Sequence, residues 1–247
     1  MVQPGFLSTS AGNVFTVRHY DQAPSRGAVV VVPPFAEEMN CCRRIVTKLA
    51  TQLTPAGYQL FLFDFFGTGD SSGQIEDATA DIWLQNLGEV LAHVRAEHDL
   101  AAVLSIRLGS HIALQVQDLF ADVQHICWQP LLSTRMQFTE LCRHAAISQR
   151  LRKERSILSV DSLFAELEAG NTVDLAGYSV TSKLGQSLLD LDNNVPEQNS
   201  SECLVARPCK SIPPDWHCQS VKTSKYWQLI DAPFPRQLIN ETICKFH

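Results

Sequence analysis

Short runs of mainly hydrophobic residues alternate, along the first half of the chain, with longer segments of helical spacing. The runs show no alternation of hydrophobic and polar positions, which is typical of strands buried on both faces. They lie at Val29–Val32, Gln59–Phe63, Ala101–Ser105 and Ile126–Trp128. Between them, hydrophobic residues recur every three or four positions, as on the buried face of a helix. Strands that alternate with helices in this way predict a mostly parallel sheet with helices on both faces, the α/β class.

The pattern changes near residue 133. From there to about residue 200, helical spacing dominates, polar loops interrupt it, and the segment 192–201 is rich in Asn and Ser. Strand-like spacing then resumes weakly at Cys203–Ala206. We therefore predict a core built from residues 1–132 and 201–247, with residues 133–200 inserted as a helical lid over the C-terminal ends of the strands.

Composition narrows the class of protein. The 247 residues are 45% hydrophobic and 19% charged, as in ordinary soluble domains, and the net charge of −6 provides no basic field to attract nucleic acid. No apolar run approaches the ~18 residues that span a bilayer, and the N-terminus lacks the features of a signal peptide. We therefore expect a cytoplasmic protein without a membrane span. The eight cysteines follow no metal-ligand spacing, so we expect no metal and no other cofactor.

The most informative segment is a predicted turn from a strand into a helix at residues 105–109, Ser-Ile-Arg-Leu-Gly. Small residues two before and two after a central position are typical of the G-x-S-x-G nucleophile elbow of α/β hydrolases, because that turn is strained and closely packed. The central residue here is Arg107, where an active hydrolase would carry serine or cysteine. The context therefore predicts an elbow whose nucleophile is replaced.

A glycine-rich loop upstream supports this interpretation. The loop Asp64–Gly73 follows a predicted strand and resembles the tight turn that many α/β hydrolases carry ahead of the elbow. A dinucleotide-binding fingerprint is the alternative for Gly67 and Gly69, but Ser72 stands where the third glycine should be. We therefore favour the hydrolase interpretation.

The first predicted strand ends where α/β hydrolases place their oxyanion loop. Pro33 and Pro34 have no amide hydrogen, so Phe35 and Ala36 are the nearest donors upstream of the elbow. The amide of Leu108 would be the second donor, by its position after the elbow residue. We therefore include Phe35 and Leu108 among the predicted binding residues.

Motifs in separated parts of the chain resemble the exosortase A system-associated hydrolases of the second type. They are Pro33–Asn40, Arg107–Gly109, Trp128–Pro130 and Val173–Tyr178, in that order, and the resemblance spans roughly residues 15–235. The resemblance implies an α/β-hydrolase fold, and a protein partner in the envelope polysaccharide or protein-sorting machinery of Gram-negative bacteria. Because a fold does not establish turnover, the family's hydrolase name does not settle whether this chain is an enzyme.

The remaining members of a catalytic triad are hard to identify. In α/β hydrolases the histidine follows the acid and lies near the C-terminus. His217 is the candidate base, although it precedes the last predicted strand rather than following it. His111, four residues after Arg107 on the same helix face, would flank the floor of the pocket or serve in packing.

Two functions remain open from the sequence. One is an ester or thioester hydrolase with altered chemistry; the other is an inactive binding or scaffolding module that kept the pocket. A guanidinium stays protonated and cannot accept an acyl group, but it binds carboxylates and phosphates well. We expect Arg107 to pair with Glu37 or Glu38 when no ligand is bound, and a small anionic or acyl ligand to compete for it.

Overall fold

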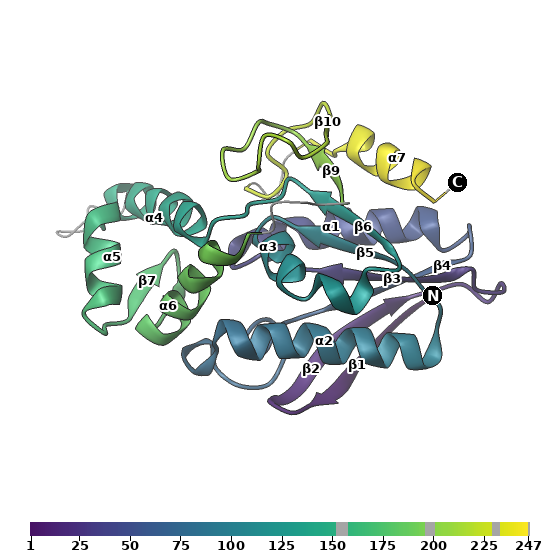
Figure 1. Cartoon of the computed structure of the whole chain (residues 1–247), viewed down its shortest axis with the longest axis horizontal. Coiled ribbons are helices and arrows are strands. Elements are labelled where there is room, and N and C mark those ends of the chain that lie inside the picture. The colour runs from purple at the N-terminus through teal and green to yellow at the C-terminus, as the bar shows by residue number, and fades with distance from the viewer. Residues whose placement is uncertain (152–157, 196–200, 229–232, 247) are drawn as a thin grey trace.

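The computed structural model describes residues 1–151, 158–195, 201–228 and 233–246. Its main feature is an eight-stranded sheet (Figure 1). The strands are β1 (Val2–Thr9), β2 (Gly12–His19), β3 (Gly27–Val32), β4 (Tyr58–Phe63), β5 (Leu100–Ile106), β6 (Gln124–Trp128), β9 (Glu202–Val205) and β10 (Cys218–Ser220). Their order across the sheet is β1-β2-β4-β3-β5-β6-β9-β10.

Pairing in this sheet is parallel from β4 to β10, and antiparallel between β1 and β2 and between β2 and β4. Every residue of β3 is buried, as its uninterrupted run of valines predicts. The predicted mostly parallel sheet is therefore confirmed, with all four predicted central strands in it. The terminal hairpin is an addition that the pattern of hydrophobic residues did not reveal.

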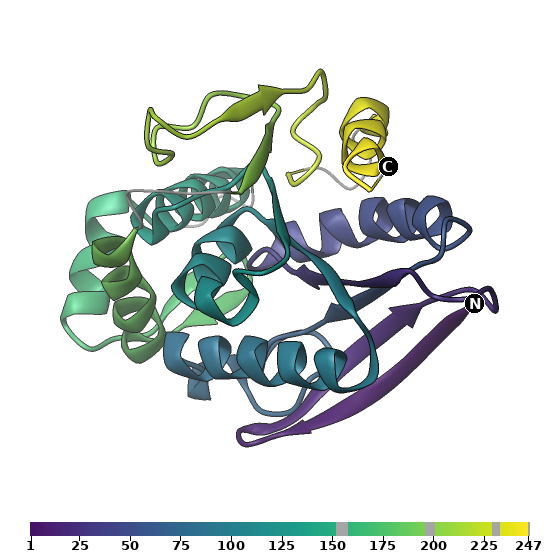
Figure 2. The ribbon, with the colours of Figure 1, turned by 45° about the vertical axis from the view of Figure 1, so that its right-hand side comes forward.

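Helices cover both faces of the sheet, as predicted. Side chains of α1 (Glu37–Leu53) and α7 (Arg236–Cys244) share one hydrophobic cluster with one face of the strands. Those of α2 (Ala80–Glu97) and α3 (Leu108–Gln115) belong to a second cluster on the other face. Figure 2 shows the two pairs on opposite sides of the sheet. Two short 3₁₀ helices, Ile75–Asp77 and Gln117–Phe120, precede α2 and follow α3.

The segment predicted as the lid leaves the core after β6 and lies at one end of the molecule (Figure 1). Its elements are α4 (Thr134–Leu151), α5 (Val160–Glu168), α6 (Ser182–Asp190), a 3₁₀ helix η3 (Leu191–Asn194), and the small antiparallel pair β7 (Val173–Leu175) and β8 (Tyr178–Val180). The hairpin was not predicted, because three-residue strands are too short to show alternation. The lid boundaries stay a prediction, and the one at residue 200 lies outside the described residues.

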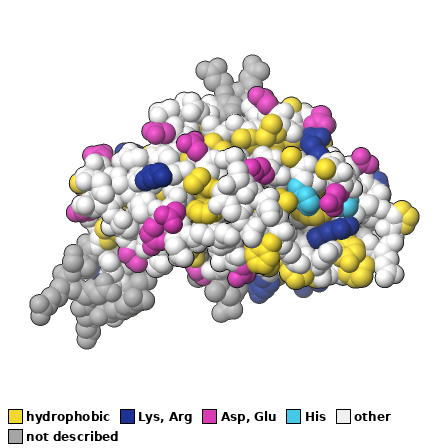
Figure 3. Space-filling model, turned by 90° about the horizontal axis from the view of Figure 1, so that it is seen from below, with side chains coloured by type: hydrophobic (Ala, Val, Ile, Leu, Met, Phe, Trp, Pro, Cys, Tyr) yellow, Lys and Arg dark blue, Asp and Glu magenta, His cyan; other side chains and the backbone are white. Residues whose placement is uncertain are grey.

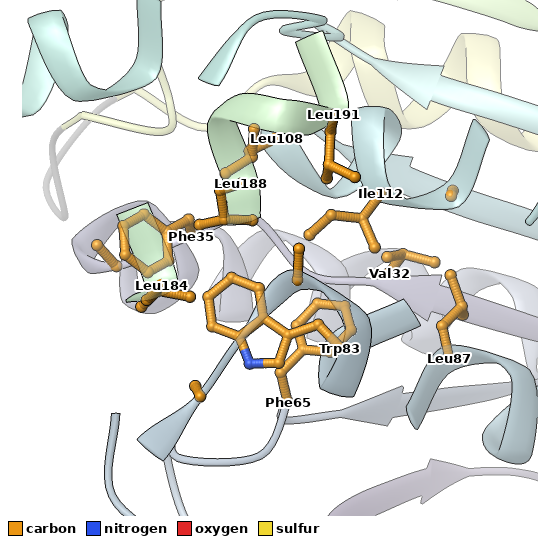
Figure 4. Close-up of a cluster of buried hydrophobic side chains, with 14 of the residues drawn as sticks. Val32, Phe35, Phe65, Trp83, Leu87, Leu108, Ile112, Leu184, Leu188 and Leu191 are labelled. Atoms are coloured by element: carbon orange, nitrogen blue, oxygen red, sulfur yellow. The ribbon is translucent and has the colours of Figure 1, made fainter. Parts of the chain in front are cut away.

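The lid is joined to the core by a hydrophobic cluster (Figure 4), and hydrogen bonds within the lid join its first helix to η3. Asp192 of η3 accepts hydrogen bonds from the Thr134 amide (2.6 Å) and the Ser133 hydroxyl (3.0 Å), so it caps the start of α4. The cluster contains side chains from both parts: Leu184, Leu188 and Leu191 from the lid, and Trp83 and Ile112 from the core. These contacts hold α4 over the C-terminal edge of the sheet.

The surface carries charges of both signs. On the face drawn in Figure 3, acidic and basic side chains are interspersed among polar and hydrophobic ones rather than gathered into one field. This distribution agrees with the modest net charge of −6. No helix in the described ranges is both long and apolar enough to cross a membrane.

Candidate functional site

The turn between β5 and α3 places a single strained residue at the C-terminal edge of the sheet. Arg107 lies there with φ 55° and ψ −122°, a region that non-glycine residues adopt at a cost of about 1–3 kcal/mol. Its backbone is held on both sides, because its amide donates to the Trp128 carbonyl (3.1 Å) and its carbonyl accepts from the Leu131 amide (3.1 Å). The predicted strand–turn–helix is confirmed.

Small residues flank this turn for the reason the sequence suggested. A Cβ at Gly109 would lie 2.3 Å from the Pro33 carbonyl oxygen, so the start of α3 packs directly against the backbone that follows β3. Ser105, on the other side, is fully buried. The close approach brings the Pro33 loop and the Arg107 turn side by side.

The Arg107 side chain points into an ion pair rather than into solvent. Its Nε lies 3.2 Å from both carboxylate oxygens of Glu38, and its Nη2 donates to Glu38 Oε1 at 3.0 Å. The same Nη2 donates to Glu140 Oε2 of α4 at 2.6 Å. The predicted pairing with Glu38 is confirmed, whereas Glu37 instead accepts from the Tyr178 hydroxyl (3.4 Å). One guanidinium therefore joins α3, α1 and the lid.

Burial and pairing act against each other at this site. Arg107 is only 2% exposed and Glu38 only 5%. Burial lowers the pKa of Arg107, but the charges and hydrogen bonds of Glu38 and Glu140 outweigh it, so the pKa lies above its ordinary value. Burial raises the pKa of Glu38 more than the neighbouring guanidinium lowers it. The cation is therefore fixed at every working pH, and its partner carries most of the cost of desolvation.

A cavity of about 270 Å³ opens beside the ion pair. It is lined by Glu37, Glu38, Glu140, Leu141, His144, Ala176, Trp227 and Gln228. Arg107 lies behind this wall, with its guanidinium carbon 4.8 Å from the centre of the Trp227 ring. The cavity thus has acidic and aromatic walls, contributed by α1, α4, the β7–β8 hairpin and the segment after β10.

Two predicted binding residues lie in the core instead. The Phe35 ring packs against Trp83, with centroids 5.6 Å apart, and the Leu108 side chain is fully buried. Neither lines the cavity. Their proposed role depends on backbone amides, and that assignment stays a prediction.

His111 lies apart from the cavity and joins α3 to the lid. Its ring is fully buried, with Nε2 3.0 Å from the Leu191 carbonyl and Nδ1 3.6 Å from an Asp192 carboxylate oxygen. Burial lowers its pKa despite the nearby carboxylate. Of the two roles that the sequence left open, His111 therefore has the packing role and does not lie on the floor of the pocket.

His217 does not reach the elbow. It is exposed and immediately precedes β10, whose first residue, Cys218, pairs with Cys203 at the start of β9. In a parallel sheet this is the amino edge of the strands, opposite the carboxyl edge that carries Arg107. The structure therefore gives no support to His217 as a base, because the direction of the strands places it at the edge of the sheet opposite Arg107.

Six of the eight lining residues escaped the sequence-based prediction, among them Glu140, His144 and Trp227. Glu140 and His144 are four residues apart on α4 and so share a helix face, which is the one signal that was available. Trp227 follows the last strand in a segment without regular spacing. Their meeting with Glu38 depends on how the lid docks, which a local pattern does not encode.

A second polar cluster is buried under the sheet edge. Ser105 Oγ lies 2.7 Å from His125 Nε2, and His125 Nδ1 lies 2.7 Å from Ser201 Oγ. Cys127 Sγ is 3.5 Å from the same Nε2. All four side chains are buried and none lines the acidic cavity, so their contacts serve to satisfy one another. Within the described ranges, no group of three or more His, Cys, Asp or Glu is arranged to hold a metal.

Comparison with known proteins identifies the fold. No family model and no curated protein matches the sequence. Among solved structures, the chain is similar to Est1E from Butyrivibrio proteoclasticus, with a TM-score of 0.66, 12% identity, and coverage of 98% of this chain and 97% of that one. It is also similar to mouse alpha/beta hydrolase domain-containing protein 10, with a TM-score of 0.61, 15% identity, and coverage of 99% and 100%. The chain has the α/β-hydrolase fold.

A third match, a putative hydrolase from Agrobacterium vitis, has a TM-score of 0.55 and 15% identity over 83% of this chain and 78% of that one. At such low identities the likeness shows the fold alone. The strained turn at Arg107, from β5 into α3, has the strand–turn–helix form of that fold's nucleophile elbow. The cavity at its side is where open α/β sheets bind their ligands.

Proposed function

We propose that this chain is a binding module on an α/β-hydrolase fold, with Arg107 in the place of the nucleophile and no serine-type hydrolysis. One observation carries the proposal: the residue at the elbow is a guanidinium held in a buried ion pair with Glu38. A guanidinium is protonated at any working pH and has no lone pair to offer an acyl carbon.

The catalytic histidine of a triad is also hard to place. In α/β hydrolases it follows the last strand, and here the one histidine after β10 is the terminal His247, which lies outside the described residues. The segment after β10 instead brings Trp227 over the guanidinium. His144 lines the cavity, but it comes from the lid and has no serine or cysteine among its fellow lining residues. These features favour ligand binding over acyl transfer.

We further propose a role beside the exosortase A and exopolysaccharide machinery, with a protein partner there. This finer statement depends on the resemblance, and the geometry supports it in one respect, because its motifs meet around the ion pair. Trp128 accepts from the Arg107 amide, and Tyr178 donates to Glu37 within the Pro33–Asn40 motif. Segments far apart in the sequence thus form one site.

The test is a panel of activated esters and thioesters, assayed with the wild type, Arg107→Ala and Arg107→Ser. We expect no turnover above that of Arg107→Ala, and no gain in Arg107→Ser, because a new hydroxyl at the elbow would have no histidine–carboxylate pair to activate it. Turnover that is present in the wild type and lost in Arg107→Ala or His144→Ala would show that the chain is a hydrolase and would overturn the proposal.

A further inference from the structure

We propose that Cys203 and Cys218 form a reversible disulfide when the protein meets hydrogen peroxide or another hydroperoxide. The modification site lies on the sheet, and neither cysteine lines the cavity beside Arg107. The inference is therefore independent of the proposed function. In the structure all eight cysteines are free thiols, which is the reduced state of such a site.

Three cysteines form a row across neighbouring strands of the sheet. In parallel register, Cys203 of β9 is paired with Cys127 of β6 on one side and with Cys218 of β10 on the other. Register partners lie on the same face, and strands about 4.8 Å apart place Cα atoms within the range of about 4.4–6.8 Å that a disulfide spans. The Cys203 thiol is also in hydrogen-bonding contact with both neighbouring thiols. Its sulfur is therefore in position to bond to either of them.

Exposure selects Cys218 as the thiol that an oxidant reaches. Cys127 and Cys203 are 0% and 2% exposed, whereas Cys218 is partly exposed on the strand at the edge of the sheet. An accessible thiol with a second thiol next to it is the usual arrangement of a reacting and a resolving cysteine. Burial raises the pKa of Cys218 more than the hydrogen bond with Cys203 lowers it, so the reaction should be faster at alkaline than at neutral pH.

The third cysteine of the row is placed to accept the proton of the resolving thiol. Cys127 Sγ lies 3.5 Å from both His125 Nε2 and Ser105 Oγ. Burial raises the pKa of Cys127, but hydrogen bonds with Cys203, His125 and Ser105 outweigh it, so the pKa lies well below its ordinary value. Cys127 therefore accepts a hydrogen bond from the Cys203 thiol, on the side away from Cys218.

The reaction balances with one molecule of peroxide. The Cys218 thiolate attacks a peroxide oxygen, the O–O bond breaks, hydroxide leaves, and Cys218 becomes a sulfenic acid. The Cys203 sulfur then attacks the Cys218 sulfur, while its proton passes to Cys127; the S–O bond breaks, the S–S bond forms, and hydroxide leaves again. The two hydroxides become water with the protons of the two thiols. The thiols have lost two electrons, and the peroxide has gained them.

The bond would fasten a short strand that carries part of the candidate site. β10 has three residues and is paired with β9 through Cys218, Gln219 and Ser220. The segment that follows β10 brings Trp227 over the Arg107 guanidinium. Oxidation therefore adds a covalent link at the base of one wall of the cavity.

The experiment treats the full chain with hydrogen peroxide, alkylates the remaining thiols, and identifies linked peptides by mass spectrometry. It compares the wild type with Cys218→Ser and Cys203→Ser. The matched controls are Cys244→Ser, which removes an exposed thiol on α7, and Cys209→Ser, which removes the other partly exposed thiol near Cys218. Circular dichroism checks that each protein is folded before oxidation.

We expect a peptide linked through Cys203 and Cys218 in the wild type and in both controls, and its loss after treatment with dithiothreitol. In Cys203→Ser, Cys218 should remain as a sulfenic acid that dimedone traps. In Cys218→Ser, which changes a partly exposed residue and so keeps the test valid if Cys203→Ser does not fold, Cys203 should stay reduced. Linkage of Cys218 to Cys209, linkage only in urea, oxidation of Cys203 without Cys218, or oxidation of Cys244 alone would each overturn the inference.

Discussion

Replacing Glu38 with leucine should destabilise the protein more than most single substitutions do. The change leaves Arg107, which is 2% exposed, with Glu140 as its one remaining carboxylate partner. Removing one partner of a buried ion pair costs about 3–5 kcal/mol. Because Glu140 stays 2.6 Å away, we expect the lower end of that range, about 3 kcal/mol. In a domain of this size that corresponds to about 6–12 °C in melting temperature.

The companion variants separate the ion pair from simple packing. Arg107→Met should cost less, about 2 kcal/mol, because Glu38 can then neutralise itself by taking up a proton, and its pKa is already raised by burial. The double variant Arg107→Met/Glu38→Leu should lie within about 1 kcal/mol of the wild type, since an apolar pair can replace a buried ionic one at little cost.

Urea unfolding, followed by tryptophan fluorescence and circular dichroism, gives the free energy of unfolding of all four proteins at pH 7. The expected coupling between the two substitutions is about 4 kcal/mol, which is large for a pair in contact. A coupling below about 1 kcal/mol, or a Glu38→Leu variant as stable as the wild type, would refute the reasoning. It would mean that the pair is hydrated in solution and that the turn is held by its backbone contacts.

Two further predictions concern the turn and the lid. Gly109→Ala should lower the free energy of unfolding by more than about 3 kcal/mol, because its Cβ would overlap the Pro33 carbonyl. The control is Gly88→Ala, in the middle of α2, which should be neutral or slightly stabilising. Equal effects of the two substitutions would contradict the close approach of Gly109 to Pro33. The pKa of His111 is lowered in the folded protein, so the unfolded chain binds the proton more tightly. The free energy of unfolding, measured by urea titration, should therefore fall as the pH drops below about 6.5. A His111→Gln variant that loses as much stability over the same pH interval would argue against this origin.

Much of the core follows from local patterns. Val29–Val32 and Ala101–Ser105 are recognisable as central strands because nothing in them needs to face water. The elbow at Arg107 was predictable for a related reason, since a strained turn with close backbone contacts restricts its flanks to small residues. From that topology, pairing with one of Glu37 and Glu38 could be predicted before any coordinates, and the structure selects Glu38.

The walls of the cavity were less accessible to sequence reasoning. Glu140 and Trp227 come from the lid and from the segment after the last strand, and each meets Arg107 only through tertiary docking. His217 was a misleading candidate, because its place on the amino side of β10 is evident only once strand direction is known. The spacing of hydrophobic residues shows which face of a single helix or strand is buried. It does not show contacts between elements that are distant in the sequence, such as those made by Glu140 and Trp227.

The hydrogen bonds between Asp192 and the start of α4 have a consequence for how such a protein can evolve. They tie together the first helix of the lid and the 3₁₀ helix that follows α6, so the segment from Thr134 to Asp192 begins and ends almost at one point. Segments whose ends lie together can be exchanged with little disturbance to the host domain. Glu140 travels with such an exchange, whereas Arg107 and Glu38 stay behind. The insert therefore supplies one of the three carboxylates of the cavity wall, and an exchanged lid would change the charge of that wall while the core stays the same.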